Sequence, residues 1–193
     1  MSSAAGLGAG AARLALGVLL VLYPPLVWYA LSRGSAQSGA LWLLALAIPL
    51  ALLSQRRQSV RVARTLGAAP FATVGALVLA ATLDRAEFLL LVPTAINAVF
   101  LLAFGVTLRP GAMPMVERFA RLHLSDPSPA QLAWCRLWTW IWCAFFVANG
   151  TVAGLLALLA PLDIWAFYAG FLAYVLSGSL FAVEYLLRRR RFG

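Results

Sequence analysis

The chain has 193 residues, of which 63% are hydrophobic and only 11% are charged, and its mean hydropathy is +0.90. One water-soluble core could not bury so much apolar surface, so the composition excludes a soluble globular domain and predicts an integral membrane protein. The net charge of +9 comes entirely from arginine, because the chain has no lysine. Beside apolar segments, such charge indicates topology and anionic lipid head groups rather than nucleic acid.

Apolar runs of about the length that crosses a bilayer recur along the chain and predict an all-α, polytopic membrane protein. We expect one transmembrane domain covering residues 1–193, with six spans at about 14–31, 38–53, 67–83, 88–108, 133–160 and 164–187. A five-span alternative, in which the second and third runs form a re-entrant pair, would place basic residues where they are costly.

The first span carries Pro24-Pro25, and this pair removes backbone donors and predicts a kink or a break in the helix. A packing kink is the simpler interpretation, and a discontinuous helix beside a ligand site is the alternative. Arg13 before an apolar run also resembles the start of a secretory signal. However, the run is longer than a signal core and carries Trp28 and Tyr29 near its far end, which favours an uncleaved span.

The longest connection, 109–131, follows the fourth span and alternates apolar with charged residues. This pattern predicts one short amphipathic helix at the cytoplasmic membrane surface, between spans four and five. Glu117 and Arg121 are four residues apart, which is the spacing of an intrahelical ion pair. The segment 125–129 (Ser-Asp-Pro-Ser-Pro) offers capping side chains and prolines that suit a first helical turn.

From Pro129 to Ala160 the sequence stays compatible with a helix about 48 Å long, so its first turns should project from the bilayer into the cytoplasm. Cys135 and Cys143 lie eight residues apart on this helix. At that separation they can form neither a disulfide with each other nor a CxxC metal site. We expect both to be small core residues.

Arginine counts near the span ends predict the orientation. If the six spans alternate, thirteen of the fifteen arginines fall on one side, and only Arg33 and Arg85 fall on the other. Positive residues gather on the cytoplasmic side of membrane proteins. We therefore expect both termini in the cytoplasm and the protein in a bacterial inner membrane.

Two groups of polar residues are candidate sites. The first is a cytoplasmic set that could form one patch for an anion or an acidic partner; it comprises Arg109, Glu117, Arg118, Arg121, Arg136, Glu184 and Arg188. In the simpler interpretation, Glu184 pairs with Arg136 or with an arginine of the 188–191 tail and clamps the last two helices. The second group is Asn97 and Asn149, which can hydrogen-bond across spans four and five as helix glue; a ligand site between them is the alternative.

Enzyme motifs are incomplete in this sequence. His123 is the sole histidine, and Asp126 follows it at a spacing that does not match the HxxxxD motif of glycerolipid-type acyltransferases. Arg109-Pro110 matches one piece of a lipid phosphatase signature whose histidine-bearing parts are missing. We therefore expect no catalytic centre, no cofactor and no metal site.

Three stretches carry a family resemblance: 109–122 (RPGAMPMVERFARL), 134–150 with its WxWCxFFxxNG pattern, and 180–192 (LFAVEYLLRRRRF). They resemble an uncharacterised family of bacterial membrane proteins encoded in aryl-polyene and xanthomonadin-type pigment clusters. The first three spans match this family in hydropathy alone. The resemblance implies neighbouring acyl carrier proteins, ketosynthases, dehydratases and acyltransferases, and it brings no activity or site residue of its own. Acyl carrier proteins are acidic, so an arginine-rich face could dock one.

The sequence therefore favours a non-catalytic accessory protein of the inner membrane that supports the synthesis or handling of a lipid-like or polyene product. Its expected partners are anionic lipids and cytosolic biosynthetic enzymes, and nucleic acid is not expected. A small transporter or exporter of a lipophilic molecule, which would use the first span and the region of Asn97 and Asn149, is the second hypothesis. A membrane-bound acyl or lipid transferase, which would use Glu117, His123 and the arginines, is the third.

Overall fold

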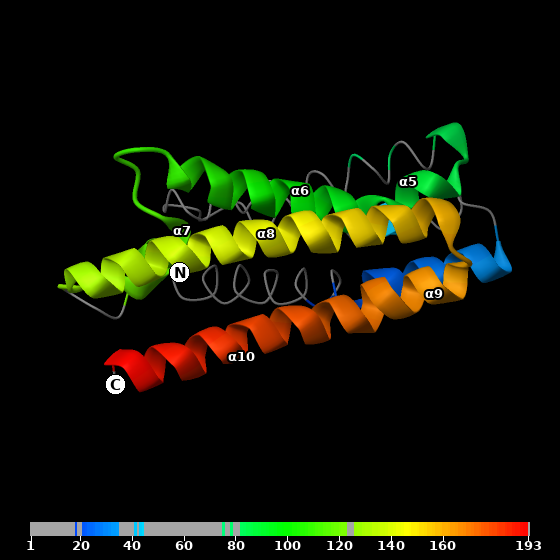
Figure 1. Cartoon of the computed structure of the whole chain (residues 1–193). Helices are drawn as coiled ribbons and strands as arrows, with labels where there is room; N and C mark the ends of the chain where they lie inside the picture. Colours follow the sequence, from blue (N-terminus) through cyan, green and yellow to red (C-terminus); the bar gives the residue numbers. More distant parts are fainter. Residues whose placement is uncertain are drawn as a thin grey trace, which may run out of the picture.

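Figure 1 shows the computed structural model of the chain, which describes residues 18, 21–34, 41, 43–44, 75, 78, 82–122 and 126–192. Every regular element in these ranges is a helix, which confirms the all-α class. The predicted spans at 38–53 and 67–83 lie largely outside the described residues, and so does His123.

The labelled elements follow one another without a sheet in the described ranges. They are α5 (Ala86–Leu90), α6 (Val92–Gly105), the 3-10 turn η1 (Val106–Leu108), α7 (Met115–Ala120), α8 (Pro129–Leu159), α9 (Leu162–Phe167), the π-helical turn η2 (Tyr168–Leu172) and α10 (Ala173–Phe192). Figure 1 shows α8 running antiparallel to α6 and to the rod formed by α9, η2 and α10. Residues 21–33 are also helical and lie near α9 (Figure 1).

The proline pair of the first span does not break its helix, because residues 21–33 remain helical through Pro24-Pro25. The alternative of a discontinuous helix is therefore wrong, and the packing kink stays a prediction. Tertiary contacts hold the segment: the Tyr23 hydroxyl donates a hydrogen bond of 2.9 Å to the Leu89 carbonyl oxygen, and Val27 is fully buried. Such contacts can offset the two backbone hydrogen bonds that a proline pair removes.

The predicted fourth span, 88–108, is helical but carries an interruption at Leu91, where α5 ends and α6 begins. Pro93 is the physical cause, since a proline ring clashes with the carbonyl four residues before it and has no N–H to donate. Pro93 is instead tolerated in the first turn of α6, where an N–H would lack a partner.

The start of α8 follows the prediction made from 125–129. Ser128 is the N-cap, its hydroxyl accepts a hydrogen bond from the Gln131 backbone N–H at 3.3 Å, and the Gln131 side chain accepts from the Ser128 N–H at 2.8 Å. This reciprocal capping box, with Pro129 as the first helical residue, begins a helix of 31 residues. The long helix predicted from Pro129 onward is therefore confirmed.

The described core lies mainly between α6 and α8, and two glycines of α8 allow the close approach. A Cβ placed on Gly150 would lie 2.9 Å from the Asn97 Cβ, and one on Gly154 would lie 3.2 Å from the Thr94 hydroxyl oxygen. Gly150 and Gly154 form a GxxxG pattern, which lets helix backbones approach closely. An aromatic cluster continues the contact along both helices, formed by Phe100, Phe104, Trp142 and Phe146.

Two helices in the described part of the chain are long and apolar enough to cross a membrane: α8, and the continuous helix Leu162–Phe192 formed by α9, η2 and α10. Only 39% and 6% of the residues in their most apolar windows are buried. Leu159 is 80% exposed and Phe181 is 64% exposed. These helices therefore differ from the core helix of a soluble domain, whose apolar residues are covered by protein.

We predict that Gly150→Ala forces α6 and α8 apart, because the added methyl group overlaps the Asn97 side chain. Thermal unfolding of the purified protein in detergent should show a lower Tm and a loss of about 1–3 kcal/mol. Gly178→Ala is the matched control, since a Cβ at Gly178 meets nothing within 4 Å. Equal Tm values for the two variants would contradict the proposed close contact.

Candidate functional site

The first turns of α8, helix α7 and the last turns of α10 meet at one end of the described structure, which we call the arginine end (residues 108–122, 126–138 and 184–192). The Trp134 indole N–H donates a hydrogen bond of 3.3 Å to the Glu184 carboxylate. The Arg191 guanidinium lies 5.6 Å from the centre of the Trp134 ring, and the Phe192 ring packs edge-on against Trp134 at 5.8 Å. Trp134 thus joins α8 to α10.

Glu184 pairs with an arginine of the 188–191 tail, which is one of its two predicted partners. Arg188 Nε lies 3.1 Å from the same Glu184 oxygen that accepts from Trp134. The contact is an ion pair rather than a hydrogen bond, since the buried Nε–H is not directed at an acceptor. The other predicted partner, Arg136, donates to the Leu108 carbonyl at 2.7 Å and so neutralises the end of η1.

Glu117 and Arg121 form the ion pair that their spacing predicts. Arg121 Nε lies 2.8 Å from Glu117 Oε1, and the Glu117 residue is only 8% exposed. Arg118 donates to the Met113 carbonyl at 3.1 Å. The charged side chains of α7 are therefore anchored on their own segment.

Two threonines dock α7 on the other helices, and the sequence analysis missed both. The Thr107 hydroxyl accepts from the Met115 N–H at 2.9 Å, and the Thr139 hydroxyl accepts from the Val116 N–H at 3.2 Å. These hydroxyls satisfy N–H groups that a short helix leaves unpaired. No sequence signal marks them, because each threonine also looks like an ordinary buried residue of an apolar helix.

The predicted patch is brought together in part. Glu117 pairs with Arg121, and Glu184 pairs with Arg188. Arg109 is exposed at the end of η1, while Arg118 and Arg136 bind backbone carbonyls on the α7 side. Cys135 and Cys143 are free and buried, as predicted.

A second polar group joins three helices midway along α8. The Tyr168 hydroxyl donates to Asn149 Oδ1 at 2.8 Å, Asn149 Nδ2 donates to Asn97 Oδ1 at 3.1 Å, and Asn97 Nδ2 donates to the Pro93 carbonyl at 2.8 Å. The predicted hydrogen bond between Asn97 and Asn149 is therefore confirmed. Each amide oxygen and one N–H of each amide have partners inside the protein. This favours a role of the two asparagines in holding the helices together over a ligand site between them.

Tyr168 is the member of this hydrogen-bonded group that the sequence analysis missed. It begins the π-helical turn η2, where the helix Leu162–Phe192 gains an extra residue in one turn. A π-helical turn leaves no composition signal, and such turns frequently lie beside functional sites. Here it turns the Tyr168 hydroxyl towards Asn149.

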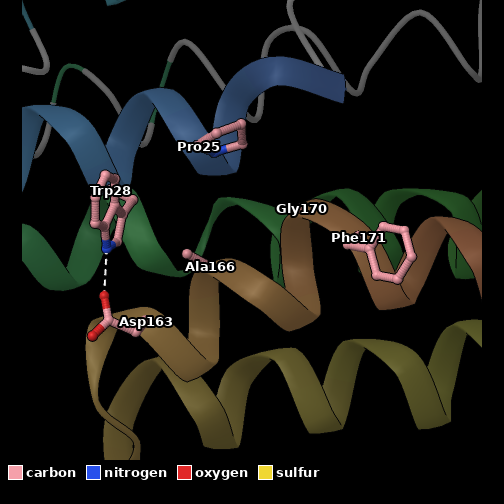
Figure 2. A pocket seen from close by; sticks show the side chains of 6 residues that line it. All are labelled: Pro25, Trp28, Asp163, Ala166, Gly170 and Phe171. Carbon is pink, nitrogen blue, oxygen red and sulfur yellow. Dashed lines mark hydrogen bonds between the residues drawn. The ribbon is translucent and has the colours of Figure 1, made fainter.

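A groove of about 350 Å³ lies at the opposite end of the helices, between the helical segment 21–33 and the start of the helix Leu162–Phe192. Figure 2 shows its lining residues, with the Trp28 indole donating a hydrogen bond to Asp163. The lining is otherwise apolar and consists of Pro25, Ala166, Gly170 and Phe171. Sequence reasoning did not predict this groove, because its two walls are far apart in the chain.

Comparison with known proteins finds no match to a protein-family model, a curated protein or a solved structure. Among the residues that the structure describes, no group of three or more histidine, cysteine, aspartate or glutamate side chains could hold a metal ion. The functional proposals therefore rest on the geometry of three places: the arginine end, the hydrogen-bonded group of Tyr168, Asn149 and Asn97, and the groove.

We predict that Asn149→Ala lowers the free energy of unfolding by about 1–2 kcal/mol, because it removes the acceptor of Tyr168 and the donor to Asn97. Tyr168→Phe should destabilise the wild type but be nearly neutral in the Asn149→Ala background. A double-mutant cycle followed by thermal unfolding measures this coupling.

Tyr185→Phe is the control for that cycle, since Tyr185 is exposed on α10. An equal cost of Tyr168→Phe in both backgrounds would show that the hydroxyl and Asn149 do not interact.

Proposed function

We propose that the chain is a multi-pass protein of the bacterial inner membrane, with six spans and both termini in the cytoplasm. In this proposal it is a non-catalytic accessory protein that supports the synthesis or handling of a lipid-like or polyene product by cytosolic enzymes. The observation that carries this proposal is the arginine end, where the carboxylates of Glu117 and Glu184 are nearly buried and their guanidinium partners are more exposed.

The exposures at the arginine end support a positively charged docking surface. The side chains of Glu117 and Glu184 are only 10% and 13% exposed, whereas those of their partners Arg121 and Arg188 are 38% and 43% exposed. The remaining tail arginines, 189–191, are exposed on the last turn of α10. A partner approaching this end meets guanidinium groups first, which suits carboxylates and phosphates.

The same charges support the proposed orientation. Six described arginines outside the 188–191 tail are Arg33, Arg85, Arg109, Arg118, Arg121 and Arg136, and the last four belong to the arginine end. A cluster of arginines at one end of two apolar helices is typical of the cytoplasmic side. Anionic head groups of that leaflet would bind the rim of the same surface.

An acyl carrier protein is the proposed cytosolic partner. The resemblance of 109–122, 134–150 and 180–192 to membrane proteins of pigment clusters supports this choice, because carrier proteins are encoded beside them. The acidic surface of a carrier protein complements the open arginines, and such complementarity mainly raises the association rate.

The other two hypotheses find less support in the described residues. A transporter would need free polar groups along its path, but Asn97 and Asn149 are hydrogen-bonded to each other. A transferase would need Glu117 as an acid or base, but this carboxylate is held by Arg121.

We predict that the detergent-solubilised protein captures a purified acyl carrier protein in a salt-dependent manner. The triple variant Arg109→Gln/Arg189→Gln/Arg190→Gln should weaken binding about tenfold at low salt, since each lost rim charge contributes roughly 0.5 kcal/mol. These three arginines are exposed, so their loss leaves the two ion pairs intact.

Arg33→Gln/Arg85→Gln is the control, because it also removes arginines but not from the arginine end. Binding by surface plasmon resonance at two salt concentrations compares the variants. Capture that is unaffected by the triple variant, or equally weakened by the control, would contradict the docking proposal.

A further inference from the structure

The groove opposite the arginine end has an apolar body and one polar end. Pro25 forms one wall, and Ala166, Gly170 and Phe171 form the other (Figure 2). Trp28 and Asp163 close one end through their hydrogen bond. This division of chemistry matches an amphiphile, whose hydrocarbon part and head group need different surroundings.

Gly170 sets the depth of the apolar body. A Cβ on Gly170 would lie 3.4 Å from Pro25 Cδ and 3.5 Å from Pro24 Cβ, so little more than the space of one methyl group separates Gly170 from the proline rings. The missing side chain leaves room there, next to the exposed ring of Phe171. If the helix Leu162–Phe192 crosses a membrane, this open apolar surface faces hydrocarbon and can hold an acyl chain.

Asp163 determines which head group fits. It lies in the first turn of α9, directly after the turn that joins the two long apolar helices, and therefore at the level of lipid head groups if those helices span. Its carboxylate is exposed and accepts the Trp28 indole N–H, and neither ion pair found among the described residues involves it. An exposed carboxylate attracts an ammonium group by charge and by charge-assisted hydrogen bonds.

We propose that this groove binds a phospholipid with a protonated amine head group, of the phosphatidylethanolamine class. The ammonium group contacts Asp163 and Trp28, and one acyl chain lies against Ala166, Gly170 and Phe171. An anionic lipid without an amine is disfavoured because its phosphate meets the Asp163 carboxylate. The inference rests on the proposed membrane crossing and does not depend on the partner at the arginine end.

The test compares lipids with identical acyl chains by native mass spectrometry of the detergent-purified protein. The probes are phosphatidylethanolamine, its N-acetylated form, which lacks the positive charge, and phosphatidylglycerol. We expect one phosphatidylethanolamine to be retained in preference to either of the others. In Asp163→Asn this preference should fall by roughly fivefold, because the variant keeps an acceptor for Trp28 but loses the charge.

Two further variants make the result specific. Asp126→Asn removes the same charge from an exposed aspartate at the arginine end and should leave the lipid preference unchanged. Ala166→Leu fills the apolar body while keeping Asp163, and should reduce retention of phosphatidylethanolamine. Unfolding temperatures of all variants show whether each remains folded.

The proposal is overturned if the wild type retains the three lipids equally, or if Asp163→Asn keeps the wild-type preference. It is also overturned if the groove is covered by a second copy of the chain, which would appear as a dimer that Ala166→Leu dissociates without a change in bound lipid. Loss of carrier-protein capture with an intact lipid preference would instead contradict only the docking proposal.

Discussion

The helix Leu162–Phe192 leaves most of its apolar side chains uncovered by the described protein, and this single constraint organises the rest of the structure. Only 6% of the residues in its most apolar window are buried. Transfer of such side chains from water to hydrocarbon is favourable by about 25 cal/mol per Å² of apolar surface. A lipid environment would cover this surface, but it offers no hydrogen bonds, so polar groups within the helices must find partners inside the protein.

The polar contacts between the helices follow that requirement. Tyr168, Asn149 and Asn97 pass their hydrogen bonds from one helix to the next and end on a backbone carbonyl. The Trp165 indole and the Tyr23 hydroxyl likewise donate to carbonyls of α5. Each contact joins two helices whose surfaces are otherwise mostly apolar. Each therefore fixes the relative position of the two helices more than it adds to the stability of the fold.

The two ends of the helices differ in chemistry, and this difference underlies both proposals. At the arginine end, the carboxylates of the two ion pairs are nearly buried, and their guanidinium partners are more exposed. At the groove, an exposed carboxylate stands beside an indole ring and an apolar wall. The first arrangement suits an acidic partner, and the second suits an ammonium group joined to hydrocarbon.

Local features of this protein could be read from its sequence, whereas contacts across the fold could not. The capping box at Ser128 and the ion pair of Glu117 with Arg121 depend on residues three or four apart, so spacing predicted them. The hydrogen bond of Asn97 with Asn149 was predictable because polar side chains are scarce in apolar helices and seek each other.

The errors and omissions have a common physical cause. Pro24-Pro25 does not break its helix, because tertiary contacts of Tyr23 and Val27 hold the segment. Of the two partners predicted for Glu184, the tail residue Arg188 forms the ion pair, whereas Arg136 binds the Leu108 carbonyl. The π-helical turn at Tyr168 and the groove at Gly170 arise from helices that meet only in the folded chain. Sequence periodicity alone carries no information on such meetings.

Topology mapping tests the central claim most directly. Paired reporter fusions, one active only in the cytoplasm and one active only outside it, would be placed after Arg109, after Ala160 and at Gly193. The account predicts that the first and third positions are cytoplasmic and that the turn after Ala160 lies outside. All three positions on one side, or the carboxyl terminus outside, would contradict it.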